Sequence, residues 1–401
     1  MRRRVVWRAR SWINYVNFGI FLQALITLIA FVAALGILVG FHEFGHFLAA
    51  RLCGVRVLRF SLGFGKPLLT YRSMRSAHST EWVVGSIPFG GYVKLLDGRD
   101  AQQVILPEER HGAFDAQPLW QRSFIVAAGP VANFVLATVL FSVIYVSGAP
   151  QMPARLQTPP EQSLAARLDV RQGDQVIAWK NLGVNVNSIP QAAELSPVLS
   201  WNALRWELLD AITGHQDFAI EVIAPSKEVY LKIFKEADLS SQELKRDPFG
   251  AIGLIPASTP LSEWQDLRLN PLEAVIFASK RVWLISKVST RMMVGFFTGD
   301  TPLKQLGGPF SIADMAGKSA QVGWQAFLGF LALLSISIGL LNLVPFPMLD
   351  GGQLLYDAWE LVSGRRISVS MQERFQKIGL FLLMSLSLLA LFNDLQRYLS
   401  S

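Results

Sequence analysis

The segment FHEFGH combines two histidines and a glutamate at a spacing that could bind and use a metal ion. His42 and His46 are four positions apart, so a helix would place both imidazoles on one face, with Glu43 beside them. This pattern is typical of zinc hydrolases. Glu43 is the only charged residue between Arg10 and Arg51, and an ionisable side chain inside a membrane segment suggests a functional site. The alternative is two ordinary helix histidines near a membrane interface.

A zinc hydrolase needs a third protein ligand and keeps the fourth position open for water. Cys53 is the only cysteine, so a Cys-based cluster is excluded and the ligands must be histidines and carboxylates. Asp350 is the first charged residue after a run that is uncharged from Ser319. Its segment, NLVPFPMLDGG, contains helix breakers, which are tolerated at membrane depth only where backbone is buried in protein or lines a watery cavity. We therefore expect Asp350 to complete a Zn²⁺ site rather than merely cap a span.

The composition indicates a membrane protein. Of the 401 residues, 51% are hydrophobic and 17% are charged, and the mean hydropathy is +0.34, which is unlike an ordinary soluble enzyme. The formal net charge is +7, with five arginines before residue 11, which favours contact with anionic membrane lipid. No nucleic-acid recognition motif accompanies the scattered basic residues, so nucleic-acid binding is not expected.

Long apolar runs predict four membrane spans, at about residues 18–50, 123–146, 324–343 and 378–392. The first run is too long for a cleaved signal sequence and leads directly into the HEFGH motif, so we expect it to be retained. The fourth run is shorter than the roughly 20 residues that a crossing usually needs. Flanking basic side chains that extend to the membrane surface would compensate for the difference.

Between the first two spans, VRVLRFSLGFGKPLLTYRS and STEWVVGSIPFGGYVKLL alternate in polarity and are rich in β-branched and aromatic residues. These features predict hairpin strands. An exposed strand edge beside a metal site could hold a substrate in extended form, the alternative being a purely structural sheet. Gly90 and Gly91 are expected to permit a tight bend and to lie in the substrate-binding region.

Residues 149–257 are richer in charged residues and contain short strand-like runs, which predicts a soluble β-rich domain of about 100 residues, a common domain size. Its segment SLAARLDVRQGDQVIAWKN resembles the bacterial PDZ pattern of short helix, Gly-Asp turn and strand, although Lys180-Asn181 replaces the expected Asp-Gly turn. Residues 270–297 are predicted to form an amphipathic helix in the membrane interface, with the charged residues Glu273, Lys280, Lys287 and Arg291. A helix docked on the soluble domain is the alternative.

The predicted fold is therefore a polytopic α-helical membrane protein with about four spans, a membrane-associated β-hairpin region and a periplasmic PDZ-like β-rich domain. We expect the N-terminus and first span at 1–50, a cytoplasmic-side β-hairpin or re-entrant region at 51–122, the second span at 123–148, the PDZ-like domain at 149–257, an amphipathic interfacial region at 258–321, the third span with the LDGG sequence at 322–352, and a loop with the fourth span at 353–401.

Three segments, HEFGH, AAGPVANF and NLVPFPMLDGG, together resemble the site-2 protease family of intramembrane zinc metalloproteases. Further segments from RFSLGFGKPL to LALFNDLQRYL are similar to bacterial members, so the resemblance covers most of the chain. It implies that Zn²⁺ is bound by His42, His46 and Asp350, and that Glu43 is the catalytic carboxylate. It also implies that Asn133 and Asn342 handle substrate near the metal.

The resemblance further implies hydrolysis of peptide bonds within transmembrane segments of single-span membrane proteins, such as anti-sigma factors or remnant signal peptides. It implies a bacterial inner membrane location with the active site towards the cytoplasm and PDZ domains in the periplasm. Residues 51–122 carry ten lysines and arginines, which agrees with that orientation. The five arginines near the N-terminus would then lie outside, against the same rule. Members often have two tandem PDZ domains, whereas this chain has room for one.

Two other functions fit parts of the sequence. A catalytically silent PDZ-bearing membrane scaffold would have no need for intact His42, Glu43, His46 and Asp350, so these residues argue against it. An embedded metalloprotease of the prenyl-processing type also has a His-Glu-x-x-His helix. That type predicts a glutamate as the third ligand instead of Asp350.

Overall fold

The computed structural model describes residues 2–72, 79–100, 105–184, 190–238, 248–299 and 307–400. The chain forms two compact units, of which unit 1 is Met1–Leu140 with Leu306–Ser401 and unit 2 is Phe141–Gln305. Among the described residues, four helices are long and apolar enough to cross a membrane: Phe21–Leu52, Leu119–Ser147, Trp324–Leu343 and Val369–Arg397. The four expected spans are confirmed. The fourth is longer than its uncharged run because helix α11 (Val369–Ser400) continues through charged residues at both ends.

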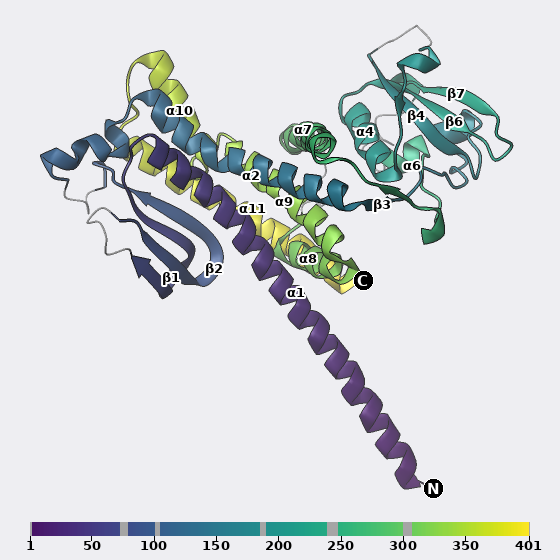
Figure 1. Ribbon diagram of the computed structural model, residues 1–401, viewed down its shortest axis with the longest axis horizontal. Coiled ribbons are helices and arrows are strands. Elements are labelled where there is room, and N and C mark those ends of the chain that lie inside the picture. Colours follow the sequence, from purple (N-terminus) through teal and green to yellow (C-terminus); the bar gives the residue numbers. More distant parts are fainter. Residues whose placement is uncertain are drawn as a thin grey trace. The chain divides into compact units, whose positions relative to one another are not determined.

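Helix α1 (Arg2–Leu52) runs through unit 1 and packs against the two helices that follow unit 2 in the sequence (Figure 1). Helices α8 (Pro309–Val322) and α9 (Trp324–Leu343) contribute to one core with α1 and with α2 (Leu119–Ser147). The buried residues of this core are Ala30, Ala34, Leu38, Leu136, Ala316, Phe330 and Leu331. Several are small, and small side chains let membrane helices approach closely. Helix α10 (Asp350–Ser363) follows α9 after a short break.

The predicted strands between the first two spans are confirmed as β1 (Val57–Arg72) and β2 (Glu81–Leu95), which pair antiparallel. Residues 57–62 pair with residues 91–95 on one side and with residues 81–84 on the other, while residues 67–72 also pair with the first part of β2. Two bent strands therefore form four neighbouring segments, and 91–95 lies at one edge. The short 3-10 turns η1 (Pro107–Gly112) and η2 (Phe114–Ala116) lead from β2 to α2.

The sheet is attached to the first span by aromatic side chains. Phe47 of α1 contacts Phe60 of β1 and Trp82 of β2, with ring centroids 5.9 and 5.2 Å apart. Such aromatic pairs stabilise beyond the area that they bury. The β-hairpin region is therefore fixed close to the HEFGH motif, which lies one turn earlier in α1. Arg75, one of the basic residues expected in this region, lies outside the described residues, as do the side chains of the N-terminal arginines.

Unit 2 contains an antiparallel sheet in the order β5-β4-β6-β7 (Figure 1). The strands are β4 (Gln175–Gly183), β5 (Ser196–Pro197), β6 (Asp217–Ile223) and β7 (Val229–Phe234). Helix α4 (Trp201–Thr213) and the short helices α3 (Leu164–Arg167) and α6 (Pro248–Ile252) belong to the same unit. The strand-like runs of the sequence form β4, β6 and β7, and the short helix, Gly-Asp turn and strand appear in the expected order.

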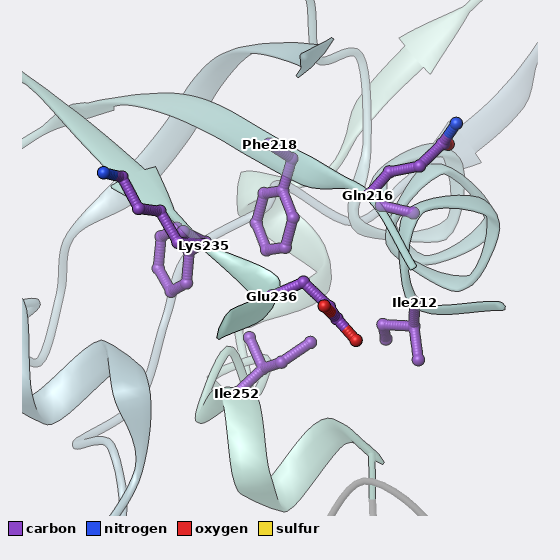
Figure 2. A pocket seen from close by; sticks show the side chains of 8 residues that line it. Ile212, Gln216, Phe218, Lys235, Glu236 and Ile252 are labelled. Atoms are coloured by element: carbon purple, nitrogen blue, oxygen red, sulfur yellow. The ribbon is translucent and has the colours of Figure 1, made fainter. Parts of the chain in front are cut away.

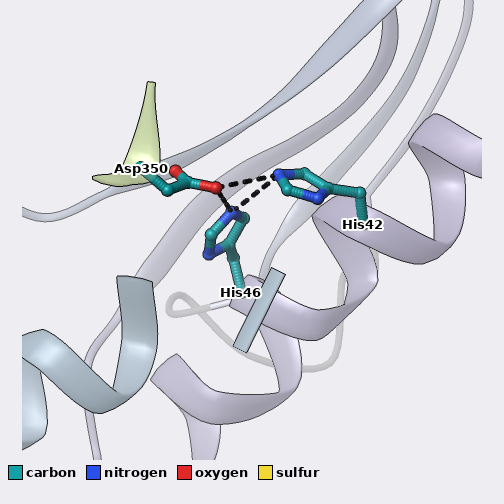
Figure 3. Close-up of side chains that lie close together, drawn as sticks. All are labelled: His42, His46 and Asp350. Atoms are coloured by element: carbon teal, nitrogen blue, oxygen red, sulfur yellow. Dashed lines mark hydrogen bonds and ion pairs between the residues drawn. The ribbon is translucent and has the colours of Figure 1, made fainter. Parts of the chain in front are cut away.

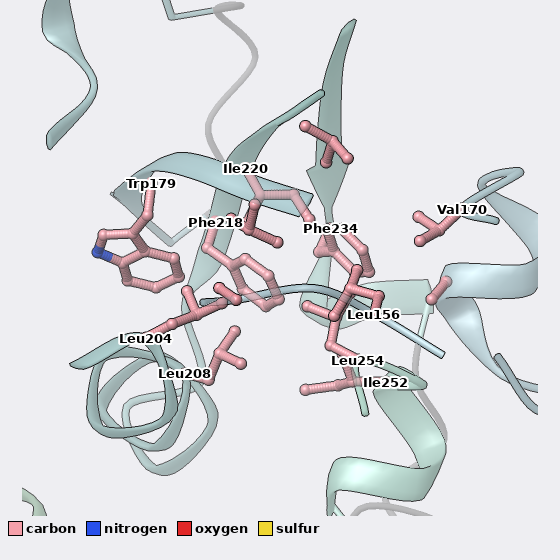
Figure 4. Close-up of a cluster of buried hydrophobic side chains, with 14 of the residues drawn as sticks. Leu156, Val170, Trp179, Leu204, Leu208, Phe218, Ile220, Phe234, Ile252 and Leu254 are labelled. Atoms are coloured by element: carbon pink, nitrogen blue, oxygen red, sulfur yellow. The ribbon is translucent and has the colours of Figure 1, made fainter. Parts of the chain in front are cut away.

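A single apolar core holds this sheet to its helices (Figure 4). Its labelled members are Leu156, Val170, Trp179, Leu204, Leu208, Phe218, Ile220, Phe234, Ile252 and Leu254. The rings of Phe218 and Phe234 stack with centroids 4.7 Å apart. Strands β3 (Ala149–Gln151) and β8 (Gln265–Leu267) form a separate two-stranded sheet in this unit.

Helix α7 (Pro271–Thr298) is the predicted amphipathic helix, and it begins with a capping box between Asn270 and Glu273. Lys287 and Arg291, expected on a solvated face, instead form ion pairs with the buried Asp210 of α4, at 2.8 and 2.9 Å. The docked-helix alternative therefore describes this part of α7. Trp283 of the same helix is 74% exposed, and the placement of α7 in a membrane interface stays a prediction.

Candidate active site

Three potential metal ligands meet where α1 and α10 approach each other (Figure 3). The Nε2 atoms of His42 and His46 are 3.2 Å apart. Asp350 Oδ2 lies 3.1 Å from Nε2 of His42 and 3.4 Å from Nε2 of His46. Two helix positions four residues apart and the first residue of a distant helix thus form a nearly equilateral triangle.

The dimensions of this triangle fit zinc. Tetrahedral zinc with bonds of about 2.0–2.1 Å places its ligand atoms about 3.3–3.4 Å apart. Asp350 Oδ2 is buried, and the partners that it faces among the described residues are the Nε2 atoms of His42 and His46. Three atoms with lone pairs therefore point to one place, an arrangement that a cation stabilises. The donor set of two imidazoles and one carboxylate is also one that zinc accepts.

Each histidine has a hydrogen-bond partner at Nδ1, and this partner decides whether Nε2 is free to bind a metal. His46 Nδ1 lies 2.9 Å from the Ile125 carbonyl, to which it donates a hydrogen bond. His42 Nδ1 lies 3.2 Å from the side-chain amide of Asn133. When that amide turns its oxygen to the ring, it accepts the Nδ1 proton, and such amide orientations are assigned from the hydrogen-bond network. Both Nε2 atoms are then free to bind a metal, as in many protein zinc sites.

Glycines let α2 approach the ligands. A Cβ atom at Gly129 would lie 2.3 Å from His46 Nε2, and one at Gly45 would lie 2.3 Å from the Ala128 carbonyl oxygen. A side chain at Gly45 would require movement of a helix, and one at Gly129 would displace the His46 ring. Both glycines are absent from the sequence-based site prediction. The sequence feature that could have identified them is their position inside the HEFGH and AAGPVANF motifs.

Strand β2 lies against the glutamate. The Val93 backbone amide donates a hydrogen bond to the Glu43 carboxylate. A Cβ atom at Gly91 would lie 3.0 Å from Glu43 Cγ, and Gly90 has a φ of +91°. The expected bend is therefore present at Gly90, while Gly91 allows the strand to approach Glu43 closely.

A cavity of about 730 Å³ contains these groups. Its lining includes the three ligands, Glu43 and residues 90–93 of β2. Asn342 also lines it, with Nδ2 3.5 Å from His42 Nε2. Of the four residues expected to bind substrate, Asn342, Gly90 and Gly91 thus face this cavity. Asn133 has no exposed surface, and the contact that it makes is with His42.

Comparison with known proteins identifies the family. The sequence matches Peptidase family M50 over residues 30–386, a range that includes every residue of this site. The chain belongs to peptidase family M50. The resemblance to site-2 proteases is thereby confirmed, and this M50 chain is a metalloprotease with zinc as its cofactor.

Relatives of this M50 protease are similar over nearly their whole length. Protease RseP of Yersinia pestis is 34% identical over 449 residues, which cover 92% of this chain and 98% of the relative. Regulator of sigma-E protease RseP of Escherichia coli is 32% identical over 451 residues, with the same two coverages. A relative from Ralstonia nicotianae that carries a zinc metalloprotease name is 32% identical over 466 residues, covering 93% of this chain and 99% of the relative.

Proposed function

We propose that this M50 protease cuts single-span membrane proteins within or near the bilayer, with His42, His46 and Asp350 as zinc ligands. The observation that carries the proposal is the ligand triangle. Two of its three residues lie on a helix long and apolar enough to cross a membrane, and the triangle lines a cavity that residues 90–93 of β2 also line. Bound zinc would lower the pKa of a coordinated water to about 7 and polarise the scissile carbonyl.

Glu43 would transfer the protons of the reaction. Its carboxylate is next to His42 in α1 and is oriented by the Val93 amide. From this position it takes a proton from the attacking water and delivers it to the leaving amine, which is general base and then general acid catalysis. The Asn342 amide, 3.5 Å from His42 Nε2, would donate a hydrogen bond to the oxyanion that forms on the scissile carbonyl.

The edge of β2 would hold the substrate. Residues 91–95 form an edge segment of the sheet, paired with residues 57–62 of β1, and residues 90–93 line the cavity. A transmembrane substrate has its carbonyls engaged within a helix, so a short segment must unwind before it can be cut. The freed segment can add to the sheet as a further strand, because backbone groups at a sheet edge are available for pairing.

We infer an inner membrane location with the metal site towards the cytoplasm. The basic residues of 51–122 support this orientation. Large apolar side chains on the outer sheet support insertion of the β-hairpin region in the membrane surface, with Leu68, Leu69 and Tyr71 each at least 66% exposed. The arginines before residue 11 then face the periplasm, against the usual preference.

The PDZ-like domain in unit 2 would lie in the periplasm and filter substrates. The alignment with the Ralstonia nicotianae relative leaves about 90 of its positions without a counterpart here, about the length of one small domain. This difference supports a single filter domain in this chain, whereas the relative has room for an additional one. The cavity at the end of α4 that includes Phe218 and Ile252 has a volume of only about 10 Å³ (Figure 2). That is about the space of one water, so this cavity cannot hold a peptide.

The names of the relatives favour a particular substrate class. The Escherichia coli and Yersinia pestis relatives are named as RseP, and the former as a regulator of sigma-E protease. Anti-sigma factors that cross the membrane once, and remnant signal peptides, have the single apolar helix that the proposed mechanism requires. We propose them as substrates, cut after an earlier cleavage has removed much of their external domain.

The test is a Glu43→Gln variant of the full chain in membranes. Cleavage of a single-span substrate should fall by about 10²- to 10⁴-fold, the usual size of a lost general base, while bound zinc stays stoichiometric. Glu373→Gln, at an exposed position of α11, serves as the matched control with normal activity. The inactive variant also traps substrates for identification by mass spectrometry. Undiminished cleavage by Glu43→Gln would refute the mechanism.

A further inference from the structure

A cluster of charged side chains connects the beginning of α2 with α10. Arg122 and Asp357 are buried, each with a side chain that is 3% exposed, and Arg122 Nη1 lies 3.8 Å from Asp357 Oδ1. Arg122 Nη2 also donates a hydrogen bond to Glu360 Oε2 at 2.8 Å. The Ser123 hydroxyl donates a hydrogen bond to Asp357 Oδ2 at 2.9 Å. Two neighbouring residues of α2 therefore hold two acidic residues that are one turn apart on α10.

The same part of α2 also supports one of the histidines. The Ile125 carbonyl, three residues after Arg122, accepts the hydrogen bond from His46 Nδ1 at 2.9 Å. Residues 122–125 thus contact both a histidine of α1 and the acidic residues of α10. A single turn of α2 therefore connects α10 to the helix that carries both histidines.

Helix α10 needs such a connection because α9 does not determine its direction. Residues 344–349 separate the two helices and include Pro345 and Pro347, which lack the backbone amide that a continuous helix requires. The backbone of Gly351 lies against the Val344 carbonyl, where a Cβ atom would come within 2.2 Å of the oxygen. This contact locates the start of α10, whereas the direction of its axis depends on contacts further along the helix.

The length of α10 between Asp350 and Asp357 makes the position of Asp350 sensitive to this cluster. Asp357 comes two helical turns after Asp350, so both lie on nearly the same face, about 10 Å apart along the axis. A tilt of about 5° around Asp357 would move Asp350 by about 1 Å, whereas the distances of metal ligands vary by only about 0.2 Å. Loss of the contacts at Asp357 would thus let the Asp350 carboxylate leave the ligand triangle.

We propose that Asp357, paired with Arg122, is a positioning residue for Asp350, and that this pair fixes α10 at the angle at which the Asp350 carboxylate meets the two histidines. This inference rests on the zinc ligands of the proposed function. Asp357 is not part of the ligand triangle and does not line the cavity that contains it, so its effect on zinc passes through Asp350.

The first experiment compares Asp357→Ala with a matched control, using the full chain in detergent. Asp210→Ala also removes a buried carboxylate with basic partners, in unit 2, where none of the proposed ligands lies. Zinc affinity is measured by competition with a chelator, and stability by thermal unfolding of the metal-free protein. Both variants should lose stability. Asp357→Ala should bind zinc about tenfold more weakly, the lower end of the range for residues that orient metal ligands, while Asp210→Ala should bind zinc as the wild type does.

A milder variant keeps the test decisive if Asp357→Ala does not fold. Asp357→Asn retains an oxygen for the Ser123 hydroxyl but loses the charge that faces Arg122, so its loss of zinc affinity should be smaller but measurable. Wild-type zinc affinity in the folded Asp357 variants would overturn the proposal.

A double variant separates positioning from a general loss of structure. In Asp350→Ala the carboxylate is already missing, so adding Asp357→Ala should weaken zinc binding by less than about twofold, because the effects of residues that act through one another do not add. If the double variant binds zinc about tenfold more weakly than Asp350→Ala alone, Asp357 acts on the histidines or on the whole fold, and the proposal is wrong.

The Asp350→Ala variant also separates this inference from the proposed function. If Asp350→Ala binds zinc as tightly as the wild type, the proposed ligand set is wrong and the inference fails with it. If Asp350→Ala loses zinc while Asp357→Ala keeps wild-type affinity, the ligand set stands and only the positioning role fails.

Discussion

The proposed role of His42 as a zinc ligand depends on a residue outside the ligand triangle. The ring binds through Nε2 only if its proton is on Nδ1, and the amide of Asn133 is the group that faces Nδ1. Because Asn133 is completely buried in α2, water cannot easily replace it. We therefore expect Asn133 to act by orienting His42, although the family resemblance associates this position with substrate.

Replacing Asn133 tests this role. Asn133→Leu removes the acceptor, and zinc affinity should fall by about 10–100-fold, as for other lost partners of metal-binding histidines. Asn133→Asp keeps an oxygen that accepts the Nδ1 proton and should retain zinc. Zinc content is measured after equilibration with a competing chelator. Equal zinc retention by the Leu and Asp variants would contradict the assignment.

The sequence identifies the residues that we propose as chemically active, but not all of the residues that position them. His42, Glu43 and His46 are identifiable because helical spacing is fixed, and Asp350 because it ends a long uncharged run. The importance of Gly129 is not identifiable in this way, because it depends on which face of α2 meets His46. That contact is set by tertiary packing rather than by local pattern.

At the scale of elements, the long helices were predictable because a bilayer requires about 20 apolar residues per crossing. The strands were predictable because alternation and β-branched residues mark them. The double pairing of residues 57–62 was not, because the register of bent strands depends on where each bend falls. The docking of α7 on Asp210 was also open, since exposed and ion-paired basic residues look alike in a sequence.

The approach of α2 to α1 gives a prediction at this scale. Gly129→Ala would place a methyl group 2.3 Å from His46 Nε2, so either the His46 ring or α2 must shift. Unfolding in detergent should become about 1–3 kcal/mol easier, the usual cost of overpacking, and zinc should be lost. Gly36→Ala in α1 is the control, because a Cβ there meets nothing within 4 Å. Equal stability and zinc content in both variants would argue against close packing.

At the scale of the whole molecule, the last helix stabilises the middle of unit 1. Asp394 of α11 is 4% exposed and accepts hydrogen bonds from the Gly308 and Ser311 amides, both at 3.0 Å, and from the Ser311 hydroxyl. These contacts cap the N-terminus of α8. Helix α8 in turn packs on α1, where Gly317 lies against Thr27. The C-terminal helix is thereby connected to the helix that carries both histidines.

Asp394→Ala removes this cap and should destabilise the protein by about 0.5–2 kcal/mol. Asp394→Asn keeps an accepting oxygen and should cost less. Thermal unfolding in detergent, followed by intrinsic tryptophan fluorescence, measures both variants. The predicted loss of stability would be refuted if Asp394→Ala unfolded at the same temperature as the wild type.

The proposed zinc ligands are divided between residues 42 and 46 and residue 350, and this has a consequence for biosynthesis. While the ribosome is still making unit 2, the first span can offer a metal ion only the imidazoles of His42 and His46. The complete site forms after the third span has entered the membrane and α10 has folded back. Zinc should therefore load late, and a chain that stops before residue 350 should not retain the metal. Metal loading thus reports that residues 42–46 and residue 350 have come together.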